Sequence, residues 1–439
     1  MAWSRGAAHL TAAMLLGHAV ACRADAAGPA KTLTRLHDPV VVSTAELASV
    51  ADHSTASFRL YRVDKGQLFP IPLQFDARDD HGDVVVDDTD EFLFDDNDEL
   101  VFMAKDTGDR ALADHWPGGC DSVLEIAVVD PLHGEQGWAY LVHFPGAPPP
   151  PAAEHYVSFD RAANQARSSF YEVDYARARN FYTGMRVTHA AGGNDTNLIR
   201  QTRMRGSPTL SLLFKDFTFE FTEQSSIVAI DGVRVGPVRA VRRVRLSIDL
   251  GPLFPDLPNG TVYTYHYFSS YVTPARIGFP WIVLKTLHAF QFEDVIDFDP
   301  RVMPMTYWDG ANREGLALAV QNGERVETGA DHDWWVHSGE AGTILHAFMI
   351  PEQWRQWGIA RGTVLKNGRG GTDGDSRRFE EPLYEAGYSL LHMTNLREAR
   401  TYDLLQADIV LPRPYRPGDE TEPMAMLRAP LRTEVRRLR

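Results

Sequence analysis

The amino-acid sequence predicts an all-β protein in which a small N-terminal β-sandwich is followed by two larger stacked sheets. Short runs of β-branched and aromatic residues, bounded by turn residues, recur along the chain, which is typical of strands. Signals for helices are few, and the clearest is residues 351–357, which begin with proline and carry two tryptophans on one side. Consecutive prolines at residues 148–151 separate a shorter group of strands from a longer one.

The first group of strands is predicted to form a β-sandwich domain with acidic loops over residues 30–147. Its expected strands cover residues 40–42, 57–63, 123–129 and 138–144. A sandwich suits such strands because each half-buried sheet needs a second sheet over its apolar face. The prolines at 148–151 are expected to form a stiff linker, since consecutive prolines adopt an extended conformation without backbone donors.

The second group of strands is predicted to form a large domain over residues 152–439. Its expected strands cover residues 209–222, 233–250, 261–273, 281–292, 343–350 and 384–393. In the first of them Phe217, Phe219 and Phe221 alternate with polar residues, and this period of two gives one buried and one solvated face. Strands so numerous favour two large sheets packed face to face.

Three segments carry a resemblance to a known group of proteins. They are FPIPLQFD at residues 69–76, DELVFMA at 98–104 and GPVRAVRR at 236–243. These segments resemble secreted bacterial proteins of the polysaccharide-lyase and galactose-mutarotase-like group. The resemblance implies a small N-terminal β-sandwich followed by a large antiparallel β-supersandwich. The matching segments belong to the scaffold, so they bring no catalytic residue with them.

The N-terminus is predicted to be a secretory signal over residues 1–26. Arg5 precedes a short apolar run, and the small residues at 24–26 offer a cleavage site. The run is too short to span a bilayer, and no later segment is long and apolar enough to be a transmembrane helix. We therefore expect a periplasmic or extracellular protein. Because a small residue precedes Cys22, the alternative is a lipoprotein anchored at the outer membrane through that cysteine.

The charge of the chain is concentrated in one acidic belt. Fourteen of the 34 residues from Asp76 to Asp109 are Asp or Glu, and the net charge of the whole chain is -15. This charge argues against nucleic acid as a partner, since phosphates need clustered positive charge. Within the belt, five consecutive oxygen-bearing residues form a candidate Ca²⁺ site: Asp95, Asp96, Asn97, Asp98 and Glu99. The alternative is a solvated loop without a metal.

Two neighbouring strands carry the candidate catalytic and anion-binding groups. Tyr265 and His266 lie on opposite faces of one expected strand and are candidates for proton transfer. Arg243 and Arg245 share a face of the preceding strand with Arg239, and arginine forks bind carboxylates such as that of a uronate sugar. The alternatives are an aromatic core row and arginines that pair with the protein's own carboxylates.

The segment around residue 335 supplies a candidate stacking surface for a sugar. On a strand, Trp334 lies on one face while Trp335 and His337 lie on the other. Tryptophan beside histidine suits carbohydrate binding, and the alternative is a strand end with one buried tryptophan. Standard nucleophile, zinc-protease and nucleotide-binding motifs are absent from the sequence, so no nucleotide or organic cofactor is indicated.

Two hypotheses for function follow from these observations. In the first, the protein is an exported, carbohydrate-associated protein that cleaves an anionic glycan as a polysaccharide lyase. This hypothesis requires Tyr265, Arg243, Trp335 and His337 to meet in one cleft. In the second, it is a non-catalytic periplasmic or surface protein with a binding or structural role, stabilised by Ca²⁺. Groups that are paired internally on separate faces favour the second.

Overall fold

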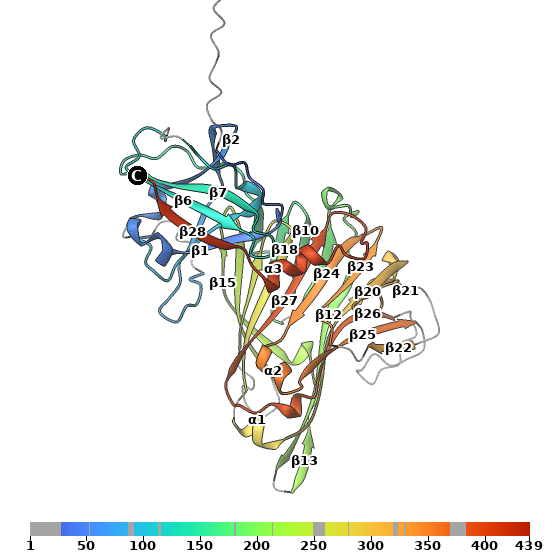
Figure 1. Cartoon of the computed structure of the whole chain (residues 1–439). Coiled ribbons are helices and arrows are strands. Elements are labelled where there is room, and N and C mark those ends of the chain that lie inside the picture. Colours follow the sequence, from blue (N-terminus) through green and yellow to red (C-terminus); the bar gives the residue numbers. More distant parts are fainter. Residues whose placement is uncertain are drawn as a thin grey trace, which may run out of the picture.

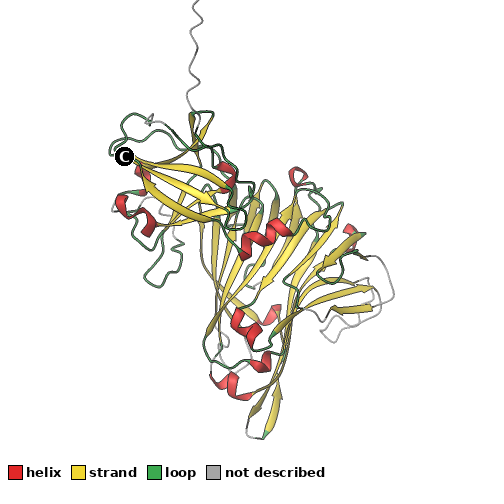
Figure 2. Cartoon of the chain, in the orientation of Figure 1, coloured by secondary structure: helices red, strands yellow, loops and turns green. Residues whose placement is uncertain are grey.

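The computed structural model describes residues 28–51, 53–86, 92–112, 116–179, 181–212, 214–248, 260–279, 281–318, 324–328, 331–368 and 383–439. The predicted signal at 1–26, with Cys22, lies outside these residues. The protein is mainly β, with 52% strand, 12% helix and several antiparallel sheets (Figure 2). This content confirms the predicted fold class. No helix within the described ranges is long and apolar enough to cross a membrane.

The small domain consists of two sheets that pack on one another. One sheet has the order β1 (Pro39–Ser43), β5 (Glu99–Met103) and β4 (Gln74–Asp76). The other has the order β28 (Arg432–Arg437), β6 (Ser122–Val129), β7 (Gln136–His143), β2 (Phe58–Asp64) and β3 (Gln67–Ile71). Alternate residues of both sheets, such as Val42, Phe102, Leu60 and Ile126, form a common buried core. This is the sandwich that the short alternating strands predict.

The large part of the molecule contains two long sheets that face one another (Figure 1). The nine-stranded sheet has the order β15 (Ser226–Val235), β16 (Ala240–Ile248), β17 (Gly260–His266), β18 (Ser270–Gly278), β27 (Thr401–Leu411), β24 (Gly342–Met349), β23 (Trp334–Gly339), β20 (Met305–Asp309) and β21 (Leu316–Leu318). The seven-stranded sheet comprises β13 (Lys215–Thr218), β12 (Ile199–Leu212), β19 (Leu287–Phe298), β26 (Leu383–Leu391), β25 (Ala360–Gly368), β22 (Glu324–Thr328) and β14 (Phe221–Thr222).

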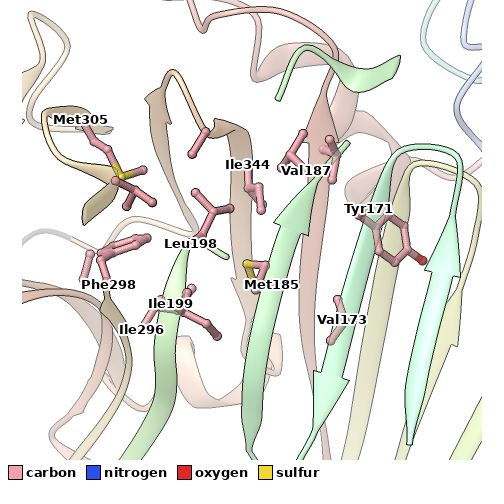
Figure 3. Close-up of a cluster of buried hydrophobic side chains, with 14 of the residues drawn as sticks. Tyr171, Val173, Met185, Val187, Leu198, Ile199, Ile296, Phe298, Met305 and Ile344 are labelled. Carbon is pink, nitrogen blue, oxygen red and sulfur yellow. The ribbon is translucent and has the colours of Figure 1, made fainter. Parts of the chain in front are cut away.

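A four-stranded sheet contributes to the core between the two long sheets. Its order is β11 (Tyr182–Val187), β10 (Tyr171–Tyr175), β9 (Gln165–Ser168) and β8 (Val157–Asp160). Side chains from all three sheets meet in the largest buried cluster, including Val173 from β10, Phe298 from β19 and Ile344 from β24 (Figure 3). Apolar packing therefore fills this part of the space between the long sheets.

The helices are short and lie at strand ends. The α-helices are α1 (Trp281–Thr286), α2 (Glu352–Gln356) and α3 (Thr421–Arg428). The 3-10 helices are η1 (Thr44–Val50), η2 (Thr55–Ser57), η3 (Ala104–Asp106), η4 (His189–Ala191), η5 (Glu223–Ser225), η6 (Pro300–Val302) and η7 (Met393–Asn395). The predicted helix after Pro351 is confirmed as α2. The strand expected at 281–292 is wrong in its first half, which is α1, because a short apolar run fits either structure.

The last strand of the chain belongs to the small N-terminal domain. β28 pairs with β6, so the last strand completes the sheet of the small domain, and the C-terminus lies there (Figure 1). The predicted linker at 148–151 runs without regular structure between β7 and β8, and the Pro149 carbonyl accepts a 2.6 Å hydrogen bond from Arg59 Nε. The helix α1 and strand β13 lie at the opposite end of the molecule from the small domain (Figure 1).

Candidate functional site

A cavity of about 200 Å³ opens between the two long sheets, on the side of α1 and α2. Both sheets and both helices contribute to its wall, which is almost entirely apolar. Representative lining residues are Leu210, Val262, Ile277, Val283, Phe292 and Trp354. An internal space of this kind, surrounded by hydrocarbon and aromatic groups, suits an apolar guest better than water, which needs several polar partners.

The period of two along the strands builds this wall. On β19, Phe290 and Phe292 point into the cavity, while the intervening side chains point outward. Outward-facing Glu293 receives a 3.3 Å bond from Lys366 Nζ on β25. A glycine on the neighbouring strand shapes the wall further, because a Cβ at Gly206 would lie only 2.1 Å from the Phe221 ring. The absence of a side chain there lets the aromatic ring reach the cavity.

Two short helices supply the remaining wall. Val283 of α1 and Trp354 of α2 line the cavity, although their elements are far apart in sequence. Trp354 is fully buried, and its ring packs edge-on against Phe279 at 5.9 Å and Tyr402 at 5.2 Å. Its Nε1 has no hydrogen-bond partner. The tryptophan in the predicted helix is therefore an apolar wall element.

The inner end of the cavity is polar. Asp294 follows Phe290 and Phe292 on the inward face of β19, and it is the one charged residue in the lining that the structure describes. Thr273 and Gln406, which face one another in the β18–β27 register, are the other polar side chains there. Burial, reinforced by the nearby carboxyls of Asp408 and Glu223, raises the pKa of Asp294 to about 7.

Beyond this end lies a buried polar cluster that reaches no cavity wall. His346 bonds through Nδ1 to the Asp408 carboxyl and through Nε2 to His337 Nδ1 at 3.0 Å. The Trp335 ring stacks on the His346 ring at 3.9 Å. Burial lowers the pKa of both histidines and raises the pKa of Asp408 to about 8. Trp335 and His337 are thus buried in the interior, where a glycan has no access.

His266 also lies in the interior, on the inward face of β17. Its Nε2 lies 2.7 Å from the Tyr175 hydroxyl and its Nδ1 lies 3.2 Å from the Tyr171 hydroxyl. Burial, together with the positive charge of Arg242, lowers the pKa of His266 to about 3. The ring is neutral at physiological pH and is held by two tyrosines, which is an arrangement typical of a packed polar core.

Tyr265 faces the opposite side of β17, toward the small domain. It lines a second cavity of about 320 Å³ with Arg78, Arg239 and Tyr267. The Arg239 guanidinium lies 4.8 Å from the Tyr265 ring centroid. Arg239 already bonds to carboxylates of the small domain, at 2.7 Å to Asp76 and 2.5 Å to Glu99.

The remaining predicted binding residues are also engaged by other parts of the protein. Arg243 lies 3.3 Å from Asp83 and 3.5 Å from Asp231, and Arg245 bonds to Asp231 at 2.8 Å. Trp334 packs in a separate cluster, with Arg313 at 5.1 Å from its ring. The structure therefore does not bring Tyr265, Arg243, Trp335 and His337 into one cleft. The catalytic and binding roles proposed for them stay predictions.

The acidic turn at residues 95–99 is stabilised by its own hydrogen bonds. Buried Asp98 accepts bonds from the backbone N–H groups of Arg78 at 2.8 Å and Asp95 at 2.9 Å. Glu99 bonds to Arg78 at 2.6 Å, whereas Asp95, Asp96 and Asn97 are exposed. Within the described ranges, no three acidic, histidine or cysteine side chains are grouped as metal ligands. The Ca²⁺ site stays a prediction.

Comparisons with known proteins add no assignment. No protein-family model matches the chain, and no curated protein matches it. The cavity was not predicted from the sequence, although one pattern of residues signals it. In residues 290–298, Phe290, Phe292, Ile296 and Phe298 alternate on one face, and Asp294 interrupts them. A carboxylate on an otherwise apolar strand face indicates a special environment.

Proposed function

We propose that the protein is an exported, non-catalytic binding protein that holds an apolar ligand in the cavity between its two long sheets. The supporting observation is the cavity of about 200 Å³, whose wall of aliphatic and aromatic side chains comes from both sheets and both helices. Removing apolar surface from water is favourable at roughly 25 cal/mol per Å², so an enclosed apolar wall can hold a ligand without specific polar contacts.

The arrangement of ionisable groups favours binding over catalysis. Proton abstraction requires an acid or base within hydrogen-bond reach of the substrate, together with an anion-stabilising group. The cavity wall has one carboxyl group, Asp294, and among its described lining residues no arginine, lysine or histidine. The predicted proton-transfer group His266 is packed between two tyrosines.

A polysaccharide-lyase role remains a second proposal, based on the scaffold resemblance. The observation that favours it is the second cavity at the junction with the small domain, where Tyr265 lies beside two arginines. A uronate carboxylate bound there would have to displace Asp76 or Glu99 from Arg239. Because those pairs are already short and buried, this geometry supports glycan recognition less well than it supports a structural junction.

Export fits the binding proposal. Residues 1–26 have the sequence features of a secretory signal, and a lipid anchor at Cys22 is the alternative to a freely soluble form. Apolar molecules are poorly soluble in an aqueous compartment such as the periplasm. A protein with an internal apolar cavity could keep such a molecule out of water between two sites.

Binding of Nile red tests the proposal, because this apolar dye becomes fluorescent in a dry environment. Native mature protein should enhance its fluorescence in a saturable manner. Ala275→Phe, which places a ring in the cavity, should reduce the dye affinity by about tenfold or more, since the guest and the new ring compete for one space. Ala229→Phe, on an exposed position of β15 in the same sheet, is the matched control and should bind the dye normally.

The melting temperature of Ala275→Phe should stay close to that of the native protein, because the added ring occupies existing space. Dye binding that is absent from the native protein, or that is equal in the two phenylalanine variants, would exclude the cavity as the binding site.

A further inference from the structure

We infer that Asp294 and Gln406 form the recognition site for the polar head of the ligand, and that this head is a hydrogen-bond donor such as an amine or a hydroxyl group. The inference rests on the proposed function, since it concerns the inner end of the same cavity. It narrows the ligand class to apolar molecules that carry one donor head, and it disfavours a carboxylate head wherever Asp294 is ionised.

Asp294 lies on β19 at the boundary between the cavity wall and the packed core. The inward residues of β19 are Phe290 and Phe292 on the cavity wall, then Asp294, then Ile296 and Phe298 in the packed core. Asp294 therefore lies where the apolar space ends. A ligand whose apolar body fills the cavity would meet the carboxyl group with its inner end.

The second step is the absence of a protein partner for this carboxyl group. Among the described residues, neither the Asp294 carboxyl nor the Gln406 side-chain amide forms a hydrogen bond or an ion pair. The neighbouring Glu293 points to the outside and is bonded by Lys366. A polar group removed from water without a partner destabilises the folded protein, and a donor supplied by a ligand would remove that penalty.

The third step is the sign of the surrounding charge. The ionisable groups that act on Asp294 are Asp408 on β27, Glu223 in η5 and the Tyr182 hydroxyl on β11. All three are acids, and each is uncharged or negative. Where Asp294 is ionised, a carboxylate head would be repelled and an ammonium head would be attracted, whereas a hydroxyl could donate to an oxygen of Asp294 in either form.

The fourth step is the expected dependence on pH. Burial raises the pKa of Asp294 to about 7, so the group is largely protonated at pH 5.5 and largely ionised at pH 8.5 in the empty protein. An ammonium head binds the ionised form, so its affinity should rise through this interval. The affinity of an alcohol, which can bond to both forms, should change less.

Displacement of Nile red by three ligands with the same alkyl chain tests this inference on the native mature protein. At pH 8.5, where Asp294 is largely ionised, dodecylamine and dodecanol should displace the dye at concentrations about tenfold lower than dodecanoate, as expected for one charge-assisted or neutral hydrogen bond. Asp294→Asn should remove the preference for dodecylamine over dodecanoate and its pH dependence, and Nile red itself should still bind. Glu293→Gln, the outward neighbour, is the matched control and should keep the native preference.

The outcomes separate the two proposals. If the native protein binds Nile red and dodecanoate displaces it as well as dodecylamine does, the head-group inference is wrong and the binding function stands. If Asp294→Asn and Glu293→Gln retain the same preference, Asp294 is not the recognising group. If the native protein does not bind Nile red, the proposed function is wrong, and the inference is overturned with it.

Discussion

Arginines on the two faces of β16 have different partners. On the outward face, Arg239 and Arg243 bond to carboxylates of the small domain, Asp76 and Asp83, at 2.7 and 3.3 Å. On the inward face, Arg242 lies 4.3 Å from the Tyr175 ring, and its Nε and one terminal nitrogen have no hydrogen-bond partner. The same residue type, at adjacent positions, forms ion pairs with carboxylates on one side and stacks on an aromatic ring on the other.

This difference corresponds to the different surroundings of the two faces. The outward face joins two domains, so its charges are neutralised by a fixed partner, and the acidic belt finds its counter-ions in the arginines of the large sheet. The inward face borders the space between the two long sheets, where Leu246 of β16 lines the cavity and Asp294 of β19, in the opposite sheet, has no partner in the described structure. Pairing within the protein indicates a structural junction, whereas an unpaired group beside an open space favours a ligand.

The largest expected effect on stability comes from removing a carboxylate that pairs with the arginines of the outward face. Asp76 is fully buried and bonds to Arg239, Arg234 and the Gln74 amide. Asp76→Ala should lower the free energy of unfolding by about 3–5 kcal/mol, because it removes the buried carboxylate that the buried guanidinium groups of Arg234 and Arg239 share. Denaturant unfolding followed by circular dichroism measures this loss. A loss below about 1 kcal/mol would show that the junction does not depend on these pairs.

Removing the charge of the unpaired Asp294 should raise the free energy of unfolding, whereas removing that of Asp76 should lower it. The pKa of Asp294 is raised from 3.8 to about 7, so the folded protein holds a proton that the unfolded chain releases. The stability from this group is fully present below pH 3.8 and is lost as the pH rises through about 7. Asp294→Asn should therefore stabilise the protein at pH 8.5 on the order of 2 kcal/mol, and less at pH 5. Unfolding curves at both pH values check this, and a destabilised variant at pH 8.5 would contradict it.

Several features of both faces could be predicted from the sequence. The period of two placed Arg239, Arg243 and Arg245 opposite Arg242, and it placed Tyr265 opposite His266, as the structure has them. These statements depend only on the geometry of one strand. The alternative that the outward arginines pair with the protein's own carboxylates is also confirmed. It could be predicted from composition, because an acidic chain offers arginines many partners.

The pattern of one strand does not show which distant residues contact that strand in the fold. Arg243 meets Asp83 across 160 positions of the chain, and His346 meets Asp408 across 62. The expected cleft joined Tyr265 and Arg243 to Trp335 and His337, but the strands present these pairs to different sides of the sheet. The cavity was missed because its wall comes from two sheets and two helices whose packing no local pattern specifies.

The smallest expected effect concerns the acidic turn, where paired and unpaired carboxylates lie two residues apart. Asp98 is buried and accepts two backbone hydrogen bonds, whereas Asp96 is exposed. Asp98→Ala should cost about 1–2 kcal/mol of stability with or without Ca²⁺, because two backbone donors lose their acceptor. Asp96→Ala, its matched control, should stay within about 0.5 kcal/mol of the native protein in the presence of a chelator.

Thermal melts of both variants, with Ca²⁺ and with chelator, separate the structural role of this turn from metal binding. A Ca²⁺ site at residues 95–99 would raise the native melting temperature by several degrees, since a ligand at a hundred times its Kd stabilises by roughly 2.7 kcal/mol. Asp96→Ala would then reduce that rise while leaving the melt in chelator unchanged. If the native melt is the same in both conditions, the turn is held by its own hydrogen bonds and the Glu99–Arg78 ion pair without a metal, and its exposed carboxylates are surface charge.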